Sequence, residues 1–227
     1  MKEDPLWDDE MLVHTETYLD HIKQTALKLP SEPYVEVEKR VDYSQYAPDG
    51  FGTADMIMIQ GNTLYVIDFK YGKGVPVSAE ENPQMMLYAL GAYESCKILY
   101  PIERIHLAIV QPRLPDGITE WECPLGELLE FGDYVKERAA LAIAGTGEFA
   151  PGEKTCKFCR ARKQCRARSD YNVKQAFDLG ELPPLITNEE AGKRLMAMRD
   201  VAAYQKDLQE WALSECLAGK EVPGWKA

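Results

Sequence analysis

Two aspartates and a lysine occupy one end of a predicted β-hairpin. The segments GTADMIMIQ and TLYVIDFK flank Gly61-Asn62, a pair typical of a two-residue hairpin turn. With this turn Gln60 faces Thr63, and pairing outward places Asp55 opposite Asp68. Directly opposed residues have Cβ atoms roughly 4.5–5.5 Å apart. Lys70 follows Asp68 by two residues and therefore lies on the same face.

The rest of this hairpin is apolar on both faces, which is typical of central strands covered on both sides. The aspartate face also carries Ile57, Ile59, Leu64 and Val66, and the opposite face carries Met56, Met58, Tyr65, Ile67 and Phe69. Adjacent carboxylates in such a setting are costly unless a proton or cation intervenes. Mg²⁺ or Mn²⁺ held by oxygen ligands satisfies this requirement. The alternative is a charge-compensated trio without a ligand, or a different register.

Glu36 and Glu38 lie on the predicted strand before Asp55. Either side chain can approach the site or face solvent. We keep Glu38 as a weak additional metal-ligand candidate. The loop after Lys70, YGKGVPVSAEEN, has no G-x4-GK[ST] phosphate loop, so we interpret it as a flexible loop near the site.

A second group of candidate ligands is the C-x2-C-x5-C run of Cys156, Cys159 and Cys165. In a reducing cytosol such spacing favours metal binding over disulfides. Zinc and [4Fe–4S] clusters both take four protein ligands, so a fourth would have to come from elsewhere, and Cys123 and Cys216 are the candidates. The alternative is three reduced thiols in a basic helix–turn segment.

The same region concentrates positive charge in an otherwise acidic chain. Residues 154–168 hold seven Lys and Arg and no acid, although the net charge of the chain is −11. A charge run is usually a solvated face, but this contrast favours nucleic-acid binding slightly. The candidates are Lys157, Arg160, Arg162, Lys163, Arg166 and Arg168.

The pattern of helices and strands predicts an α/β fold with a mixed sheet flanked by helices. Residues 7–28 are predicted helical, with Leu12, Leu19, Ile22 and Ala26 on one apolar stripe. Strands follow within 34–44, 52–60, 63–70 and 102–112, and residues 117–124 are a further candidate strand. Helices are predicted at 83–99, starting from Asn82 or Ser78, and at 125–144 and 188–218. This divides the chain into a core at 1–150, a Cys/Arg-rich segment at 151–185 and a helical extension at 186–227.

Composition sets broad limits on the class of protein. The chain has 227 residues, 45% hydrophobic and 28% charged, which is typical of a globular domain. No run approaches the 18 apolar residues of a membrane span, and the acidic N-terminus has no apolar signal segment. We therefore expect a cytoplasmic protein without a membrane partner.

The hairpin motif, GTAD-x12-DFK, resembles the core signature of the PD-(D/E)XK nuclease superfamily, with Asp55 as first acid and Asp68-Phe69-Lys70 as the D-x-K element. The segment NPQMMLYALGAY resembles the Q-x-x-x-Y motif of the RecB-like exonuclease branch, which places Gln84 and Tyr88 one helical turn apart. The cysteine run resembles that of iron–sulfur members of this branch. FGTAD, KYGKGVPVSAE, QMMLYALGA, IVQPR and CKFCRA resemble a phage and prophage family of unknown function.

This resemblance implies a restriction-endonuclease-like core and metal-dependent hydrolysis of DNA, with exonuclease action and a phage recombination partner as its further implications. Asp55, Asp68 and the Phe69 carbonyl would hold the metal, Lys70 would orient or deprotonate the attacking water, and Gln84 and Tyr88 would position the substrate. In the resembling nucleases the fourth cluster cysteine precedes the core.

The resembling family carries an upstream cysteine and a G-T-x-x-H-x-x-x-E element that this sequence lacks. We therefore expect a truncated gene product or an excised domain, with an incomplete metal site. The alternative function is a catalytically impaired nucleic-acid-binding module that retains the fold. A third is a small structural domain with a cysteine metal site.

Overall fold

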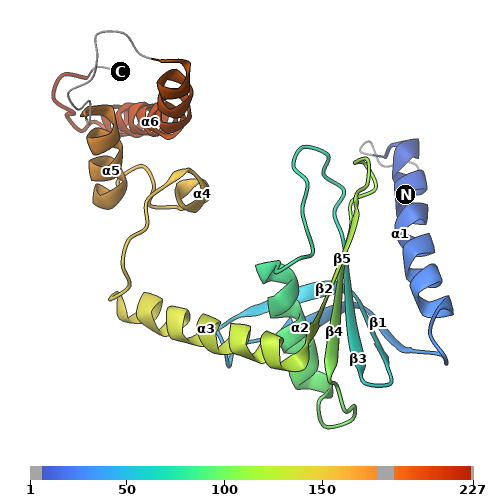
Figure 1. Cartoon of the computed structure of the whole chain (residues 1–227). Helices are drawn as coiled ribbons and strands as arrows, with labels where there is room; N and C mark the ends of the chain where they lie inside the picture. The colour runs from blue at the N-terminus through green and yellow to red at the C-terminus, as the bar shows by residue number, and fades with distance from the viewer. Residues whose placement is uncertain (1–6, 178–186, 226–227) are drawn as a thin grey trace. The chain divides into compact units, whose positions relative to one another are not determined.

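The structure, a computed structural model, describes residues 7–177 and 187–225 (Figure 1). It divides into two compact units, Met1–Gly147 and Glu148–Ala227. The first unit ends three residues before the predicted boundary at 150. The two segments predicted at 151–185 and 186–227 belong to one unit, and residues 178–186 of them lie outside the described residues.

The first unit is built on a five-stranded mixed sheet of order β1-β2-β3-β4-β5. All neighbouring strands are antiparallel except β3 and β4, which are parallel. The parallel pair requires a crossover, and a helix supplies it. The strands are β1 (Tyr34–Asp42), β2 (Phe51–Gln60), β3 (Thr63–Phe69), β4 (Arg104–Val110) and β5 (Ile118–Pro124).

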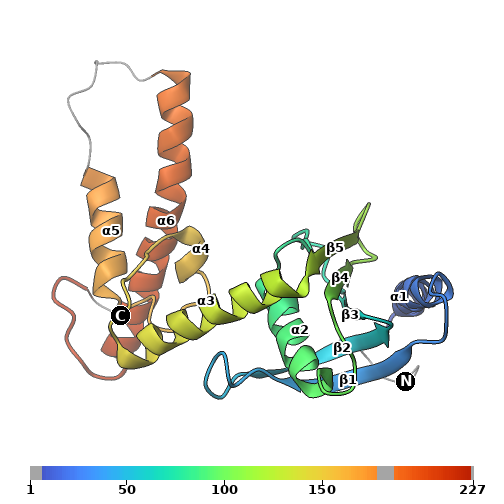
Figure 2. The ribbon, with the colours of Figure 1, turned by 60° about the horizontal axis from the view of Figure 1, so that its bottom comes forward.

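Helices cover both faces of this sheet, as predicted (Figures 1 and 2). The crossover helix α2 (Pro83–Cys96) and the following α3 (Leu125–Ala144) pack on one face, and α1 (Asp9–Leu27) packs on the other. The larger core holds Ile57, Ile59, Leu64 and Val66 with α2 residues such as Met85 and Leu90. The smaller core holds Met56, Met58 and Ile67 with Ile22 of α1. The prediction that the hairpin is apolar on both faces is confirmed.

The apolar stripe predicted for α1 is partly wrong. Leu12 and Leu19 are each 46% exposed. The buried side of the helix is formed by Ile22 and Thr25, with Tyr18 and Ala26 packed against the sheet core. The sequence pattern pointed to leucines, but a tyrosine and a threonine lie on the buried face because the helix is rotated relative to that stripe.

Helix α2 begins as the sequence predicts, because Asn82 is its N-cap. The Asn82 side chain accepts hydrogen bonds from the backbone N–H groups of Gln84 and Met85, and Pro83 occupies the first turn. This cap fixes where the helix starts and therefore where Gln84 is presented. Predicted helix 125–144 coincides with α3, which ends at Gly145 in the left-handed region.

The second unit is helical and consists of α4 (Glu153–Cys156), α5 (Arg166–Phe177) and α6 (Asn188–Leu217). Helix α5 packs against α6. Thr187 and Glu190 form a capping box that starts α6. Within the part of the chain that the structure describes, no helix is long and apolar enough to cross a membrane.

Candidate metal and catalytic site

The predicted hairpin register is confirmed along most of its length. Pairing runs from Gln60↔Thr63 to Met56↔Ile67 and stops one step before Asp55 would meet Asp68. Instead, the Asp55 carboxylate accepts a hydrogen bond of 2.7 Å from the backbone N–H of Phe69. The Asp55 side chain thus replaces the backbone acceptor that a continued ladder would supply, and it sits beside the residue that follows Asp68.

The sheet is irregular at the same level on its other side. Val37↔Met56 and Lys39↔Ala54 pair, but Glu38 between them has φ of 51°, in the left-handed region that non-glycine residues rarely adopt. Ala54 packs in the same core as Ile57, although the two lie three positions apart along the strand. In a regular strand they would face opposite sides. Glu38 and Asp55 therefore flank a break in the sheet, and such strain is often stored at functional sites.

Asp68 is the buried carboxylate of the site, with 3% of its surface exposed. Burial raises its pKa above the usual range, Asp55 adds to the rise, and Lys70 opposes it. Lys70 Nζ lies 2.8 Å from Asp68 Oδ2. At this distance the ammonium and the carboxylate form an ion pair. A buried carboxylate of raised pKa is typical of a cation or proton site.

Lys70 connects the carboxylates to α2. Its Nζ donates to Gln84 Oε1 at 3.1 Å, and Gln84 Nε2 donates to the Tyr88 hydroxyl at 3.0 Å. The prediction that Gln84 and Tyr88 share one helix face is confirmed. Tyr88 reaches β2 because residue 52 is glycine, where an added Cβ would lie 2.3 Å from the Tyr88 ring. One chain of contacts thus runs from Asp68 through Lys70 and Gln84 to Tyr88.

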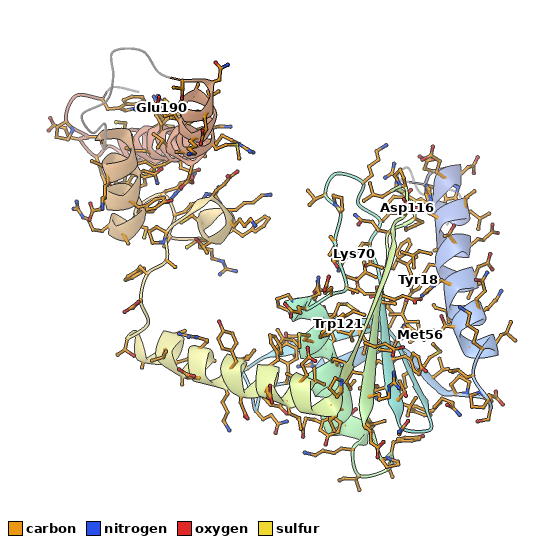
Figure 3. All side chains as sticks on the ribbon, in the orientation of Figure 1. Tyr18, Met56, Lys70, Asp116, Trp121 and Glu190 are labelled. Carbon is orange, nitrogen blue, oxygen red and sulfur yellow. The ribbon has the colours of Figure 1, made fainter. Side chains whose placement is uncertain are left out.

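Tyr18 lies on α1 where this helix faces the sheet (Figure 3). Its hydroxyl donates to the Ile67 carbonyl at 3.2 Å. Burial, and then the charges of Asp55, Asp68 and Glu38, raise the pKa of Tyr18. The sequence reasoning missed this residue, because its only signal was a polar tip on an otherwise apolar helix face.

The oxygen ligands at this site are of the type that a hard divalent cation binds, but too few of them are arranged around one point. Asp55, Asp68 and the Phe69 carbonyl offer the oxygen ligands that Mg²⁺ and Mn²⁺ prefer. Glu38, the weak candidate, is exposed at the level of the break. Across residues 7–177 and 187–225, no group of three or more His, Cys, Asp or Glu is arranged to hold a metal ion. Two carboxylates and a carbonyl would leave several positions to water, which Mg²⁺ usually retains.

The three clustered cysteines differ in environment. Cys156 is buried, Cys159 is exposed and Cys165 is partly exposed. The described residues do not bring them together as a ligand group. Cys123, one candidate for the fourth ligand, belongs to the first unit and is buried on β5. The zinc or [4Fe–4S] site therefore stays a prediction.

Several of the predicted nucleic-acid-binding side chains are paired with acids of the second unit. Asp207 Oδ2 accepts from Arg162 Nε at 3.1 Å and from Arg168 Nη1 at 2.6 Å. Lys163 pairs with Glu210 at 2.9 Å, and Arg166 lies 3.9 Å from Asp170. Arg168 is 3% exposed, which argues against a phosphate contact. Lys157 and Arg160 are exposed.

Sequence reasoning also missed Gln111, a buried amide just after β4. Its side chain bonds to the main chain of the loop that follows Lys70. One signal in the sequence could have identified Gln111. It is a polar residue directly after an apolar strand, at the point where the chain leaves the core.

Comparison with known proteins gives a family and matches to solved structures. The family described as "Protein of unknown function (DUF2800)" matches residues 1–227. A solved structure described as "Crystal structure of SSO0001" matches with 18% identity and a TM-score of 0.35, over 69% of this chain and 68% of that chain. A likeness at this level does not establish a shared fold.

Proposed function

We propose a function for this chain, which belongs to the DUF2800 family of proteins of unknown function, from the geometry of its carboxylate site: metal-dependent hydrolysis of DNA. The observation that carries the proposal is Asp68, a buried carboxylate of raised pKa between a lysine and the break in the sheet. A fold does not require this costly arrangement, whereas a cation site does.

The residues divide into two roles. Asp55, Asp68 and the Phe69 carbonyl would hold Mg²⁺ or Mn²⁺. When bound, the cation supplies positive charge at the phosphate and acidity to the attacking water. Lys70 orients that water or stabilises the charge that develops on the phosphate oxygens. Because Lys70 already bonds Gln84, the Gln84–Tyr88 pair keeps its ammonium at the carboxylates and offers polar atoms to the substrate.

The sequence resemblance to PD-(D/E)XK nucleases of the RecB-like branch supports the same reading. The motif residues form one connected site, except that no direct contact joins the first two of them. They are Asp55, Asp68, Lys70, Gln84 and Tyr88. We extend the proposal to exonuclease action in phage DNA processing or recombination. In the second unit Lys157, Arg160 and Arg166 are exposed and therefore open to DNA contact.

A second candidate is a nucleic-acid-binding module without catalysis. The observation that favours it is the small number of ligands: the described residues hold no group of three arranged for a metal. Both candidates bind DNA, so only a cleavage assay separates them.

The test is cleavage of labelled linear and circular DNA, single- and double-stranded, with Mg²⁺, Mn²⁺ or EDTA. We expect cutting with a metal, none with EDTA, and loss of cutting in Lys70→Ala. Lys136→Ala, an exposed lysine on α3, is the matched control. Binding without cutting in every metal supports the second candidate, and neither binding nor cutting overturns both.

A further inference from the structure

The segment that continues from Lys70 is held in place by one buried side chain. Gln111 is 3% exposed. Its Nε2 donates to the carbonyls of Gly72 at 2.8 Å and Val75 at 2.9 Å. Its Oε1 accepts from the Val77 backbone N–H at 3.1 Å. Both amide hydrogens and one lone-pair direction are used, so this buried polar group is well satisfied.

Neighbouring contacts fix the same segment at both ends. The Lys70 N–H donates to the Val110 carbonyl at 2.9 Å. The Arg113 guanidinium lies 4.6 Å from the centre of the Tyr71 ring. Thr119 Oγ1 accepts from the Ala79 N–H at 3.0 Å. The interpretation of this loop as flexible therefore needs correction, because its main chain is tied to the ends of β4 and β5.

Gln111 is itself fixed by a tight turn. Its N–H donates to the Gly117 carbonyl at 2.6 Å, and its carbonyl accepts from the Leu114 N–H at 3.1 Å. A Cβ at Gly117 would lie 1.9 Å from the Gln111 carbonyl oxygen, so only glycine allows this approach. The turn after β4 thus sets the direction of the Gln111 side chain.

The anchored segment presents Lys73 beside the candidate site. Lys73 is exposed and stands between Gly72 and Gly74, where an added Cβ would meet no atom within 4 Å. Three residues of chain span at most about 11 Å, so the Lys73 backbone lies within that distance of Lys70. An ammonium on an open backbone at this distance suits a phosphate next to the one at the carboxylates.

We propose that Gln111 is a positioning residue that holds the Gly72–Val77 segment, and that Lys73 on this segment binds a phosphate of the nucleic-acid backbone. This inference rests on the proposed function, which supplies the nucleic acid. It adds a binding residue and its support to the carboxylate site.

The positioning role is tested without any activity, by hydrogen exchange of Gln111→Met. The Val77 amide loses its acceptor, so its exchange should rise roughly 2- to 10-fold, as for loss of one hydrogen bond. Amides of β3 and β4 should be unchanged. Gln60→Met, at the far end of the β2–β3 hairpin, is the control and should leave Val77 unchanged. Unchanged exchange at Val77 in Gln111→Met overturns the positioning role.

The binding role is tested on the full chain with fluorescently labelled DNA in EDTA, over a series of salt concentrations. Lys73→Gln should weaken binding and lower the slope of log K against log[salt] by about 0.9 on duplex or about 0.7 on single strands. In the cleavage assay it should raise KM and retain kcat. Lys136→Gln is the matched lysine control.

Combining the two variants separates positioning from general damage. If Gln111 acts through Lys73, Gln111→Met should weaken binding by less in the Lys73→Gln background than in wild type. Full additivity overturns the link. If wild type cuts DNA while Lys73→Gln matches Lys136→Gln, the inference fails and the proposed function stands. If wild type neither binds nor cuts, the proposed function fails and the Lys73 role with it, whatever Val77 shows.

Discussion

The two units bury different kinds of side chain. In the first unit the buried residues are overwhelmingly apolar, and its buried polar residues, among those described, are Thr25, Asp68, His106 and Gln111. In the second unit the described buried residues are Cys156 and Ala212 with the polar Arg168, Asn172 and Asp200. The same observation, a buried charge, therefore has two meanings. Around Asp68 the apolar core already holds the fold, whereas around Arg168 the charges hold it.

The largest effect should come from the ion pairs of the second unit. Arg168→Met leaves Asp207 and the buried Asp200 without their shared cation, 2.6 and 3.6 Å away. Breaking a buried pair on one side costs about 3–5 kcal/mol, which is comparable to the stability of a small domain. We expect rapid hydrogen exchange throughout α5 and α6, with first-unit amides unchanged.

Arg166→Met is the control for that substitution. Arg166 is exposed, and the substitution removes only its ion pair with Asp170, at 3.9 Å. It should change α5 and α6 exchange little. If the α5 and α6 amides are equally protected from hydrogen exchange in Arg168→Met and Arg166→Met, the second unit does not depend on its buried charges.

The opposite result is expected at the buried charge of the first unit. Burial raises the pKa of Asp68, so at neutral pH the folded state holds a carboxylate that it would prefer protonated. Asp68→Asn removes this cost, and Tm at pH 7 should rise by about 2–4 °C for each kcal/mol recovered. Differential scanning calorimetry measures the shift.

The gain should depend on pH in a defined direction. Below the ordinary Asp pKa of 3.8 the carboxyl is protonated in both the folded and unfolded states, so Asp68→Asn brings no advantage there. The advantage develops as pH rises from 3.8 through the raised pKa of the folded state. A Tm that falls at pH 7 would mean that Asp68, like Arg168, is needed to hold its unit together.

A smaller effect is expected from Tyr18→Phe, which removes the hydrogen bond to the Ile67 carbonyl at 3.2 Å. The ring still packs on Phe69, 5.1 Å between centres. The loss should be about 1 kcal/mol in urea unfolding of the first unit. Tyr134→Phe, on an exposed tyrosine of α3, should be neutral. A loss of several kcal/mol would show that polar contacts also dominate the first unit.

The smallest effect is expected from Lys163→Met. Its pair with Glu210 is 36% and 49% exposed, so solvent and salt screen it. We expect at most about 1 kcal/mol, fading at high salt, in thermal unfolding of the second unit. A cost like that of Arg168→Met would show that charge alone, rather than burial, governs this unit.

Local patterns were sufficient to predict most of the first unit. Alternation of apolar residues and the Gly61-Asn62 turn predicted the β2–β3 register, and Asn82 with Pro83 predicted the start of α2. Each of these signals lies within one element or one turn. The Gln84–Tyr88 contact followed for the same reason, since one helical turn separates them.

Long-range contacts account for what the sequence did not predict. The β2–β3 ladder stops before Asp55 at the level where Glu38, on the neighbouring strand β1, has an irregular backbone, and no turn rule encodes such a feature. The pairing of Arg168 with Asp207 joins residues 39 positions apart, so the basic run looked available for nucleic acid. Gln111 likewise bonds main-chain groups more than 30 residues earlier.

We propose that Asp68 serves metal-dependent cleavage and not folding. The most direct measurement is the single-turnover rate of DNA cleavage in Mn²⁺ for wild type and Asp68→Asn, each checked for Tm. We expect a rate lower by about 10³-fold or more in a variant that is at least as stable as wild type. An unchanged cleavage rate in a folded Asp68→Asn protein would contradict it.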